Sequence, residues 1–342
     1  MPNHWDSKVI FIIGKLGVVL FFVLSGFLIS YLLFKEKEVT KTISIKKFYM
    51  RRILRIWPLY FLIVLSAFFI FPFSGWFTIE GFSKDVVWNN LGFKLILYVI
   101  FLPNLVVNLF GIVPYASQTW SIGAEEQFYL AWPVLNKYFK NRWALMFGVI
   151  FIYLAVKFPL YIFPLNKYLN IFKAFWNTTP IDCMAIGGLF ALLIYENNSA
   201  VVFVRKILFS KVIQAITFLA IIICIYKGFL LPYVHYEFYS VLFGIMICNF
   251  AYNEQRLFSM ENVLTNYLGK ISYGLYMYHP IAIVFSLKIS QQLNMALDYI
   301  IYPLAFISVI ALSVLSYEFY EKKFINKKIK YSEIVSGDNA RQ

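Results

Sequence analysis

Long apolar segments follow one another along almost the whole of this 342-residue chain. About 20 consecutive apolar residues form a helix that crosses a bilayer. Charged residues make up only 14% of the chain, whereas soluble domains carry about 25%. We therefore predict an all-α, polytopic transmembrane helix bundle. Its ten candidate helices are 9–34, 56–73, 91–110, 119–135, 143–165, 180–195, 211–231, 237–252, 271–289 and 299–320.

Basic residues predict how these helices are oriented. Cytoplasmic loops of membrane proteins are enriched in Lys and Arg, and both the segment 35–55 and the chain's C-terminal end are rich in them. If both stretches are cytoplasmic, an even number of crossings must separate them, yet nine candidates follow the first loop. We therefore expect about nine spans, with a re-entrant or broken helix within 91–135, where irregular backbone would be buried in protein or line a wet cavity.

The same argument predicts location and domain organisation. We expect a multi-pass protein of the cytoplasmic (inner) membrane, with one membrane domain at 1–325 and a cytoplasmic basic tail at 326–342. Counting crossings also places Met1 outside, so the chain reads as though one helix before the first span were absent. The net charge of +14 suits contact with anionic lipid headgroups, and we expect no nucleic-acid partner.

Two adjacent glutamates, Glu125 and Glu126, interrupt the apolar segment 119–135. A charge near the centre of a spanning helix costs roughly 2.5–3.5 kcal/mol, so intramembrane acids usually have a function. In a helix, Glu126 points about 100° away from Glu125, which shares its face with Ser121, Phe128, Tyr129 and Trp132. We favour Glu125 as a catalytic base or hydroxyl-orienting group over a structural partner for another helix.

Arg52 and Arg55 lie three residues apart, on one face of a predicted helix at the cytoplasmic mouth of a span. One guanidinium group can bind two phosphate oxygens at once, so these arginines could hold the phosphates of a cytosolic donor. Ordinary flanking charge that contacts lipid phosphate is the alternative, and charge alone favours it.

His279 lies inside the predicted span 271–289, with Tyr276 one turn and Ser272 two turns before it. Pro280 has no N–H, so a carbonyl near residue 276 is left without its usual helical donor. The histidine could move a proton near neutral pH or form a structural bond between helices, and the sequence supports both equally. The other histidines, His4 and His235, are predicted to be surface residues.

The remaining polar and small residues have structural interpretations. Asp182, just after Pro180, is predicted to cap a helix. Small residues in the same segment and at Ser25–Gly26 favour close helix packing, although Ser25–Gly26 could line a path through the membrane. The cysteines show neither metal-ligand nor disulfide spacing, so we expect buried thiols and no metal site; they are Cys183, Cys224 and Cys248.

Taken in order, several segments resemble the membrane acyltransferase 3 family, the O-acetyltransferases that modify surface glycans. No single motif is decisive, but the ordered set covers residues 16–325. The Asp182 segment and the closing Ser316–Phe324 also resemble family elements. The four main segments are Gly17–Ile29, Phe48–Tyr60 with its Arg-x-x-Arg, Thr119–Tyr129 and Ile271–His279.

The resemblance implies transfer of an acyl group, usually acetyl, from cytosolic acyl-CoA (acetyl-CoA) to a hydroxyl of an extracytoplasmic glycan. Arg52 and Arg55 match the family's donor-binding arginine pair, and Glu125 matches the acid of its Trp-Ser-x-x-x-Glu pattern. Two features depart from the family. The helix with an arginine and a catalytic histidine that should precede Gly17 is not found. Either the chain is truncated or its start was placed late, and it would be inactive if that helix were truly absent. Lys323 stands where proline is usual.

Two other functions fit part of the pattern. In a proton-coupled transporter or flippase, Glu125, Glu126 and His279 would form a proton relay, although such folds often show a repeat that this chain lacks. A donor-translocating partner of a separate transferase is the third possibility.

Overall fold

The computed structural model describes residues 8–293 and 298–332, and side chains from Ile12 onward within these ranges except those of 298 and 299. The described residues form helices and the turns between them, with no β-strand. They fall into two compact units, the first built from residues up to 43 and from 124–260, the second from 44–123 and from 261 onward. The prediction of an all-α fold is confirmed.

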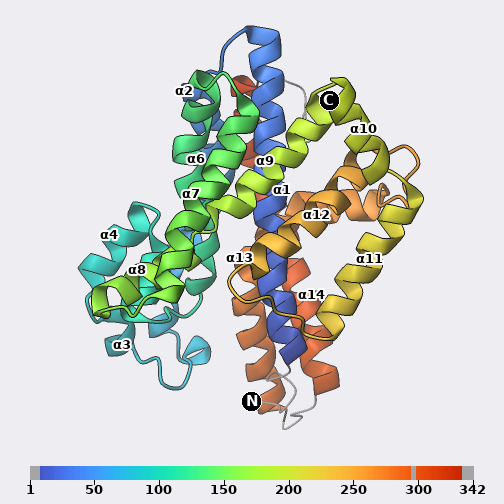
Figure 1. Cartoon of the computed structure of the whole chain (residues 1–342). Coiled ribbons are helices and arrows are strands. Elements are labelled where there is room, and N and C mark those ends of the chain that lie inside the picture. The colour runs from blue at the N-terminus through green and yellow to red at the C-terminus, as the bar shows by residue number, and fades with distance from the viewer. Residues whose placement is uncertain (1–7, 294–297, 333–342) are drawn as a thin grey trace. The chain divides into compact units, whose positions relative to one another are not determined.

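Unit 1 is arranged around helix α9, which packs against α1, α7 and α12 (Figure 1). Nearly all of α9 is buried, because it is apolar on every side. The boundary between the units falls inside α6, so this helix contributes residues to both. The helices of unit 1 are α1 (Lys8–Thr40), α6 (Trp120–Tyr138), α7 (Arg142–Ile162), α8 (Lys167–Asn177), α9 (Ile181–Tyr195), α10 (Ser199–Leu208), α11 (Lys211–Tyr226) and α12 (His235–Tyr252).

Two glycines allow α1 and α9 to lie backbone against backbone. A Cβ at Gly26 of α1 would overlap the carbonyl of Met184 in α9, and a Cβ at Gly187 of α9 would overlap the carbonyl of Val23 in α1. Small residues let membrane helices approach this closely. The predicted packing role of both small-residue segments is therefore confirmed.

A buried ion pair joins α7 to α12. The Lys157 ammonium lies 2.6 Å from a carboxylate oxygen of Glu237, and both residues are buried. Removing one member of such a pair leaves an uncompensated charge in an apolar interior. The pair was not predicted, although both residues lie in or at the edge of apolar segments where opposite charges indicate a partnership.

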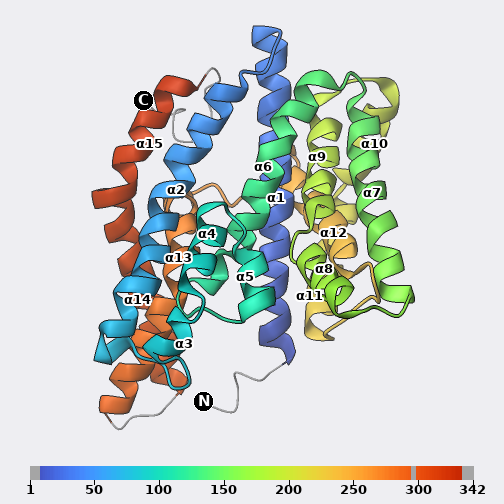
Figure 2. The ribbon, with the colours of Figure 1, turned by 90° about the vertical axis from the view of Figure 1, so that its left-hand side faces the viewer.

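Unit 2 contains the long helices α2, α13 and α14, with α15 beside α2 (Figure 2). Its elements are α2 (Ile45–Phe69), η1 (Phe71–Phe73), η2 (Gly75–Phe77), α3 (Lys84–Trp88), α4 (Leu91–Val99), α5 (Pro103–Phe110), η3 (Ser117–Thr119), α13 (Val263–Gln292), α14 (Asp298–Ser316), the π-helical turn η4 (Tyr317–Glu321), α15 (Lys322–Lys328) and η5 (Ile329–Tyr331).

The apolar segment 91–110 is broken into α4 and α5, as the sequence indicated. Phe101 adopts a left-handed backbone conformation with φ of 58°, and Pro103 begins α5 without an N–H to donate. With nine and eight residues, neither helix is long enough to cross a bilayer. Burial lowers the pKa of Lys94 in α4, whose ammonium donates to the carbonyl of Val87.

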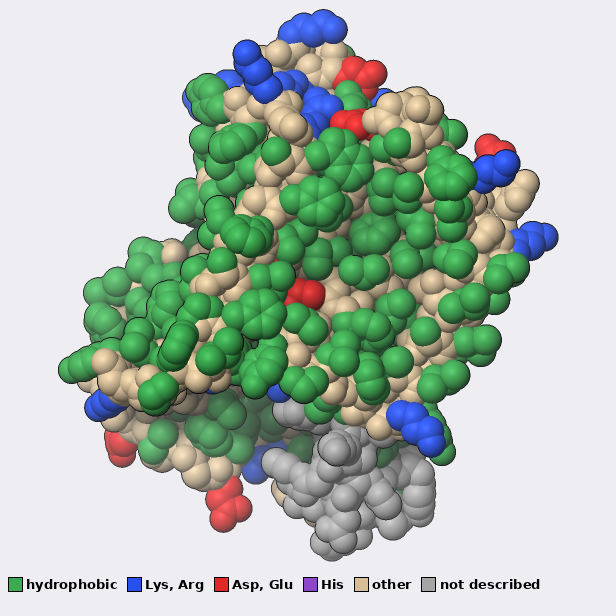
Figure 3. All heavy atoms as spheres, viewed as in Figure 1, with side chains coloured by type: hydrophobic (Ala, Val, Ile, Leu, Met, Phe, Trp, Pro, Cys, Tyr) green, Lys and Arg blue, Asp and Glu red, His purple; other side chains and the backbone are tan. Residues whose placement is uncertain are grey.

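By length and composition, five helices in the described part of the chain qualify as membrane spans, or six if α10 and α11, which meet at a 59° bend, form one span. This is fewer than the roughly nine spans predicted. The shortfall has two physical causes: α4 and α5 are too short, and buried polar residues lower the hydropathy of α6, α12 and α13. In unit 1, apolar side chains cover most of the visible face of α7, α11 and α12, while Lys and Arg gather at the last turns of α1 (Figure 3).

Candidate functional site

Glu125 lies in unit 1, on the buried face of α6 that the sequence indicated. Ser25 of α1 donates a short hydrogen bond to its carboxylate, and the Tyr129 hydroxyl donates to Ser25 Oγ over 3.2 Å. One turn further along α6, the indole N–H of Trp132 donates to Ser30 Oγ at 2.9 Å. All predicted members of this face are buried.

Where α1 meets α6, the Glu125 carboxylate accepts a hydrogen bond from one hydroxyl, Ser25, which in turn accepts one from Tyr129. Glu125 is only 1% exposed, and a carboxylate in such an environment binds hydroxyl donors strongly. Glu125 accepts a hydrogen bond from the Ser25 hydroxyl. The same carboxylate is therefore suited to orienting or deprotonating the hydroxyl of a second molecule. The sequence had suggested Ser25 only for packing or for a path through the membrane, and its role as partner of Glu125 was missed. Glu126 is half-buried.

Arg52 and Arg55 lie in the first part of α2, in unit 2, where α15 packs against α2. The neighbouring Arg51 donates from Nη1 to the carbonyl of Tyr331 at 2.7 Å, which ties α2 to the C-terminal helices. The Arg52 guanidinium lies 5.8 Å from the centre of the Phe48 ring. Arg55 is close enough to Glu321 for its charge to act on that carboxyl.

Lysines of α15 extend the positive charge of this end of unit 2. Lys327 and Lys328 occupy the last turn of α15. Together with the arginines of α2, they make a cationic surface at the end of a candidate span that begins at Ile45. Such a surface attracts polyanions and is suited to binding phosphate groups.

His279 is held in a defined tautomer by its own helix. Its Nδ1 lies 2.6 Å from the carbonyl oxygen of Tyr276, the acceptor that Pro280 leaves without its helical donor. A carbonyl can only accept, so Nδ1 carries the proton of the neutral ring and Nε2 carries a lone pair. The carbonyl predicted to lack its helical donor is thus present, and the His279 ring donates a hydrogen bond to it instead.

A second set of hydrogen bonds fixes Tyr276 in unit 2. The Tyr276 hydroxyl donates to the carbonyl of Gln118 at 2.7 Å, so the Ser121 hydroxyl, also 2.7 Å away, is the donor to Tyr276. Ser272, the other predicted neighbour of His279, instead donates to the carbonyl of Gly269 in its own helix and is exposed. It has no part in this network.

In unit 2, a hydrogen bond links α2, which carries the arginine pair, to α13, which carries His279. The Tyr273 hydroxyl of α13 donates to the carbonyl of Ile56, the residue after Arg55, at 2.9 Å. His279 follows Tyr273 by six residues, which places it about 9 Å further along the helix axis. His279 therefore lies a little more than one and a half helical turns of α13 beyond the point where α13 contacts α2.

Other predicted residues have different surroundings. Asp182 lies in the first turn of α9 as expected, but Pro180 is the N-cap and no side chain caps the helix, so Asp182 is not the cap. Its carboxyl is fully buried close to Glu237. His235, predicted to be at the surface, is half-buried at the start of α12. His4 lies outside the described residues. Cys183 and Cys248 are buried as expected, and Cys224 is half-buried.

Within the described ranges, no group of three or more His, Cys, Asp and Glu side chains is arranged to hold a metal ion. The groups available for chemistry are instead a buried carboxylate, a histidine with a free ring nitrogen, and a cationic helix end.

The described chain thus combines apolar helices long enough to cross a membrane with a buried carboxylate on α6, a histidine on α13 and a cationic end of α2. Comparison with known proteins then identifies the family: the acyltransferase 3 model, described as an acyltransferase domain, matches residues 1–318. The chain therefore belongs to this family, as its motifs indicated. No solved structure gives a significant match.

Curated relatives are consistent with this assignment. The chain is 27% identical over 289 residues to the peptidoglycan O-acetyltransferase OatA of Listeria monocytogenes serovar 1/2a, covering 78% of this chain and 44% of the relative. It is 26% identical over 351 residues to a putative O-acetyltransferase of Staphylococcus aureus strain COL, covering 93% and 54%. A putative acetyltransferase of Acidianus two-tailed virus is 28% identical over 282 residues, covering 78% and 72%. The chain thus spans about half the length of the first two relatives.

Proposed function

We propose that this protein is a membrane O-acyltransferase that moves an acyl group, acetyl in the first instance, from cytosolic acyl-CoA to a hydroxyl of an extracytoplasmic glycan. Family membership supports acyl transfer, and the names of two relatives indicate O-acetylation, one of them of peptidoglycan. The observation that carries the proposal is that α2, which carries Arg52 and Arg55, is hydrogen-bonded at Ile56 to Tyr273 of α13, about 9 Å along that helix from His279.

The donor site follows from the charge of coenzyme A. Its pyrophosphate and ribose phosphate are polyanionic, and guanidinium forks bind phosphate oxygens in pairs. Arg52 and Arg55 would hold the pyrophosphate, with the lysines of α15 adding long-range attraction. Arg51 is engaged with the carbonyl of Tyr331, so its role is to hold α15 beside the arginine pair.

The transfer step needs a base and no redox chemistry. The acceptor hydroxyl oxygen attacks the thioester carbonyl, the carbon–sulfur bond breaks, and the hydroxyl proton passes to the base and then to the departing thiolate. The His279 Nε2 lone pair and the Glu125 carboxylate are the two candidate bases. Because Nδ1 is held by Tyr276, His279 would accept the proton at Nε2 alone.

We further propose that the protein lies in the cytoplasmic (inner) membrane with its C-terminus in the cytoplasm. Arg51 lies within the basic segment 35–55, and Tyr331 lies at the C-terminal end of the described chain. Their contact supports placing both basic stretches on the same side of the membrane. Family membership favours a transferase over the alternative of a proton-coupled transporter or flippase.

The test is to reconstitute the chain in vesicles with labelled acetyl-CoA outside and glycan acceptor within. The wild type should label the glycan, and the double variant Arg52→Ala, Arg55→Ala should bind acetyl-CoA at least about ten-fold more weakly, since each hydrogen bond to a charged group contributes about 1.5–3 kcal/mol. The matched control Lys41→Gln, Lys46→Gln removes two exposed charges just before and at the start of α2 and should leave affinity nearly unchanged. Equal loss in both variants would remove the donor site, and uptake without CoA release would favour a transporter.

A further inference from the structure

A cavity of about 500 Å³ lies at the far end of unit 2 from the arginine pair, lined by Gly75, Trp76, Lys288, Gln291 and Gln292. Gly75 and Trp76 belong to the short helix η2, and the other three residues belong to the last turns of α13. The volume is within the range of roughly 300–1,000 Å³ typical of ligand pockets. Nothing in the acyl-transfer chemistry described above uses these residues.

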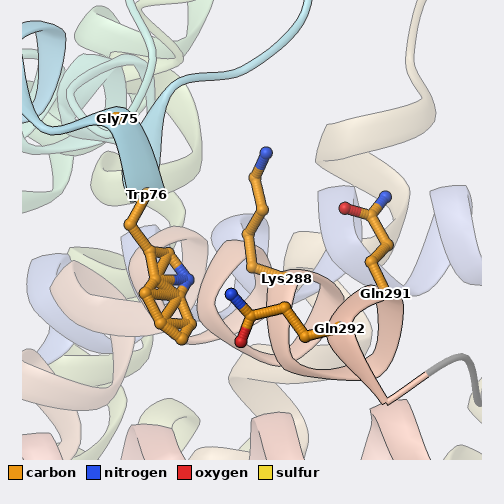
Figure 4. Close-up of a pocket in the computed structure, with 5 residues that line it drawn as sticks. All are labelled: Gly75, Trp76, Lys288, Gln291 and Gln292. Carbon is orange, nitrogen blue, oxygen red and sulfur yellow. The ribbon is translucent and has the colours of Figure 1, made fainter.

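The Trp76 ring is fixed in place and still accessible. It stacks on Phe285 of α13, with ring centroids 6.0 Å apart and planes 20° apart, and it remains 37% exposed. Figure 4 shows the Gln292 amide directed toward this ring, while the Lys288 and Gln291 side chains extend away from it. The Trp76 ring is therefore an accessible aromatic surface that lies beside the Gln292 amide in the protein without a ligand.

These side chains together match the chemistry of an acidic sugar. The electron-rich face of an indole attracts the C–H groups of a pyranose ring, and amides donate and accept hydrogen bonds as sugar hydroxyls do. Among the described residues that line the cavity, Lys288 carries the only charge, and its ammonium would select a carboxylate. A lipid phosphate, which only accepts hydrogen bonds, would leave the carbonyl oxygens of both amides unused.

The cavity lies on the acceptor side of the proposed reaction. Arg55 is 14 residues before Phe69, the last residue of α2, so helix geometry separates the two by about 20 Å. The chain reaches Trp76 seven residues after that end. If the arginines face the cytoplasm, the cavity faces the opposite side, where the glycan lies.

We propose that this cavity is a binding subsite for an acidic saccharide, the chain that carries the accepting hydroxyl. Trp76 supports a sugar ring, Gln291 and Gln292 bind its hydroxyls, and Lys288 binds a carboxylate. The assignment of the saccharide as acceptor rests on the proposed function, whereas the binding itself does not.

The test measures binding without acyl transfer, on the full chain in phosphatidylcholine nanodiscs. Two probes differ by one lactyl group: N-acetylglucosaminyl-N-acetylmuramic acid carries it with its carboxylate, and N,N′-diacetylchitobiose, called chitobiose below, lacks it. Saturation-transfer NMR should show the acidic disaccharide binding at least about five-fold more tightly. Lys288→Gln should reduce its affinity to that of chitobiose, and Trp76→Ala should abolish binding of both.

Three controls make the result specific. Trp76→Phe keeps an aromatic ring and should retain most of the binding, which separates loss of the aromatic surface from loss of folding. Lys227→Gln removes an exposed lysine of unit 1 and should change nothing. Thermal unfolding of each variant checks that the protein is intact.

The outcomes separate the two proposals. Equal binding of the two probes, or binding that is insensitive to Trp76→Ala, would overturn the saccharide subsite. If the variants instead weaken retention of phosphatidylglycerol in mixed nanodiscs, the cavity binds lipid headgroups and the proposal is wrong. A chain that binds the acidic disaccharide but transfers no acetyl group would overturn the proposed function and leave the subsite intact.

Discussion

The imidazole Nδ1 of His279 lies 2.6 Å from the carbonyl oxygen of Tyr276, three residues earlier in the same helix. In an unbroken helix that carbonyl would accept from the N–H of residue 280, but Pro280 has none. A backbone irregularity thus sets which ring nitrogen of His279 carries the proton. The free lone pair on Nε2 follows from the position of one proline.

Pro280→Ala should therefore impair the protein without removing a functional group. The new N–H would compete for the Tyr276 carbonyl and release Nδ1, so both tautomers of His279 would be populated. We expect acyl transfer to fall by about ten-fold, because a positioned base contributes at least about 100-fold. Nitrogen NMR of labelled histidine would report the tautomer. Pro303→Ala in α14 is the control, and an equal effect there would contradict the assignment.

The bond between Ser25 and Glu125 should appear as an energetic coupling. Ser25→Ala and Glu125→Gln each remove one side of a buried, charge-assisted hydrogen bond, so their effects on transfer should not add. We expect a coupling of about 1–3 kcal/mol in a double-variant cycle built from transfer rates. Additive effects within about 0.3 kcal/mol would show that the two side chains act independently.

Two glycines of the same helix should respond in opposite ways to alanine. At Gly26, a methyl group would overlap the carbonyl of Met184, whereas at Gly17 it would meet no atom within 4 Å. Gly26→Ala should lower the free energy of unfolding by about 3 kcal/mol or more. Gly17→Ala should raise it by up to about 1 kcal/mol. Denaturant unfolding in detergent measures both, and similar values would refute the close contact.

The Lys157–Glu237 pair should be more sensitive to losing one partner than to losing both. Lys157→Met leaves Glu237 buried without its cation and should cost about 3–5 kcal/mol of stability. Adding Glu237→Leu to that variant should recover part of the loss, since two apolar groups then replace the charges. Thermal unfolding of the single and double variants is the measurement. A double variant less stable than either single one would mean that the pair does not act as a unit.

Local patterns predicted part of this molecule well. The apolar segments gave the helical class, and the 3.6-residue period gave the buried face of α6 on which Glu125 lies. The missing N–H of Pro280 indicated a carbonyl near residue 276 without its usual helical donor. Small residues indicated close helix packing in the segments that became α1 and α9, but not that these two helices pack on each other. Each of these follows from a rule that acts within one helix or on one interface.

Partnerships between distant residues were not accessible in the same way. Ser25 and Glu125 are 100 residues apart, and Lys157 and Glu237 are 80 apart; only the packing of whole helices decides that they meet. Asp182 was assigned to a cap because its place in the first turn is visible in the sequence, while its complete burial is not. The span count was too high because apolar runs were counted as spans although polar residues within α6, α12 and α13 lower the mean hydropathy of these helices.

Ser25 is the neighbour of Gly26, where the main chains of α1 and α9 touch. A shift of either helix along its axis would bring a backbone carbonyl too close to the other helix. The close backbone contact therefore fixes the position of the Ser25 hydroxyl along the axis of α1. Substrates of different size would have to be accommodated by changes of side-chain rotamer. The length of acyl chain that the enzyme accepts would then depend on these rotamers and not on movement of the helices.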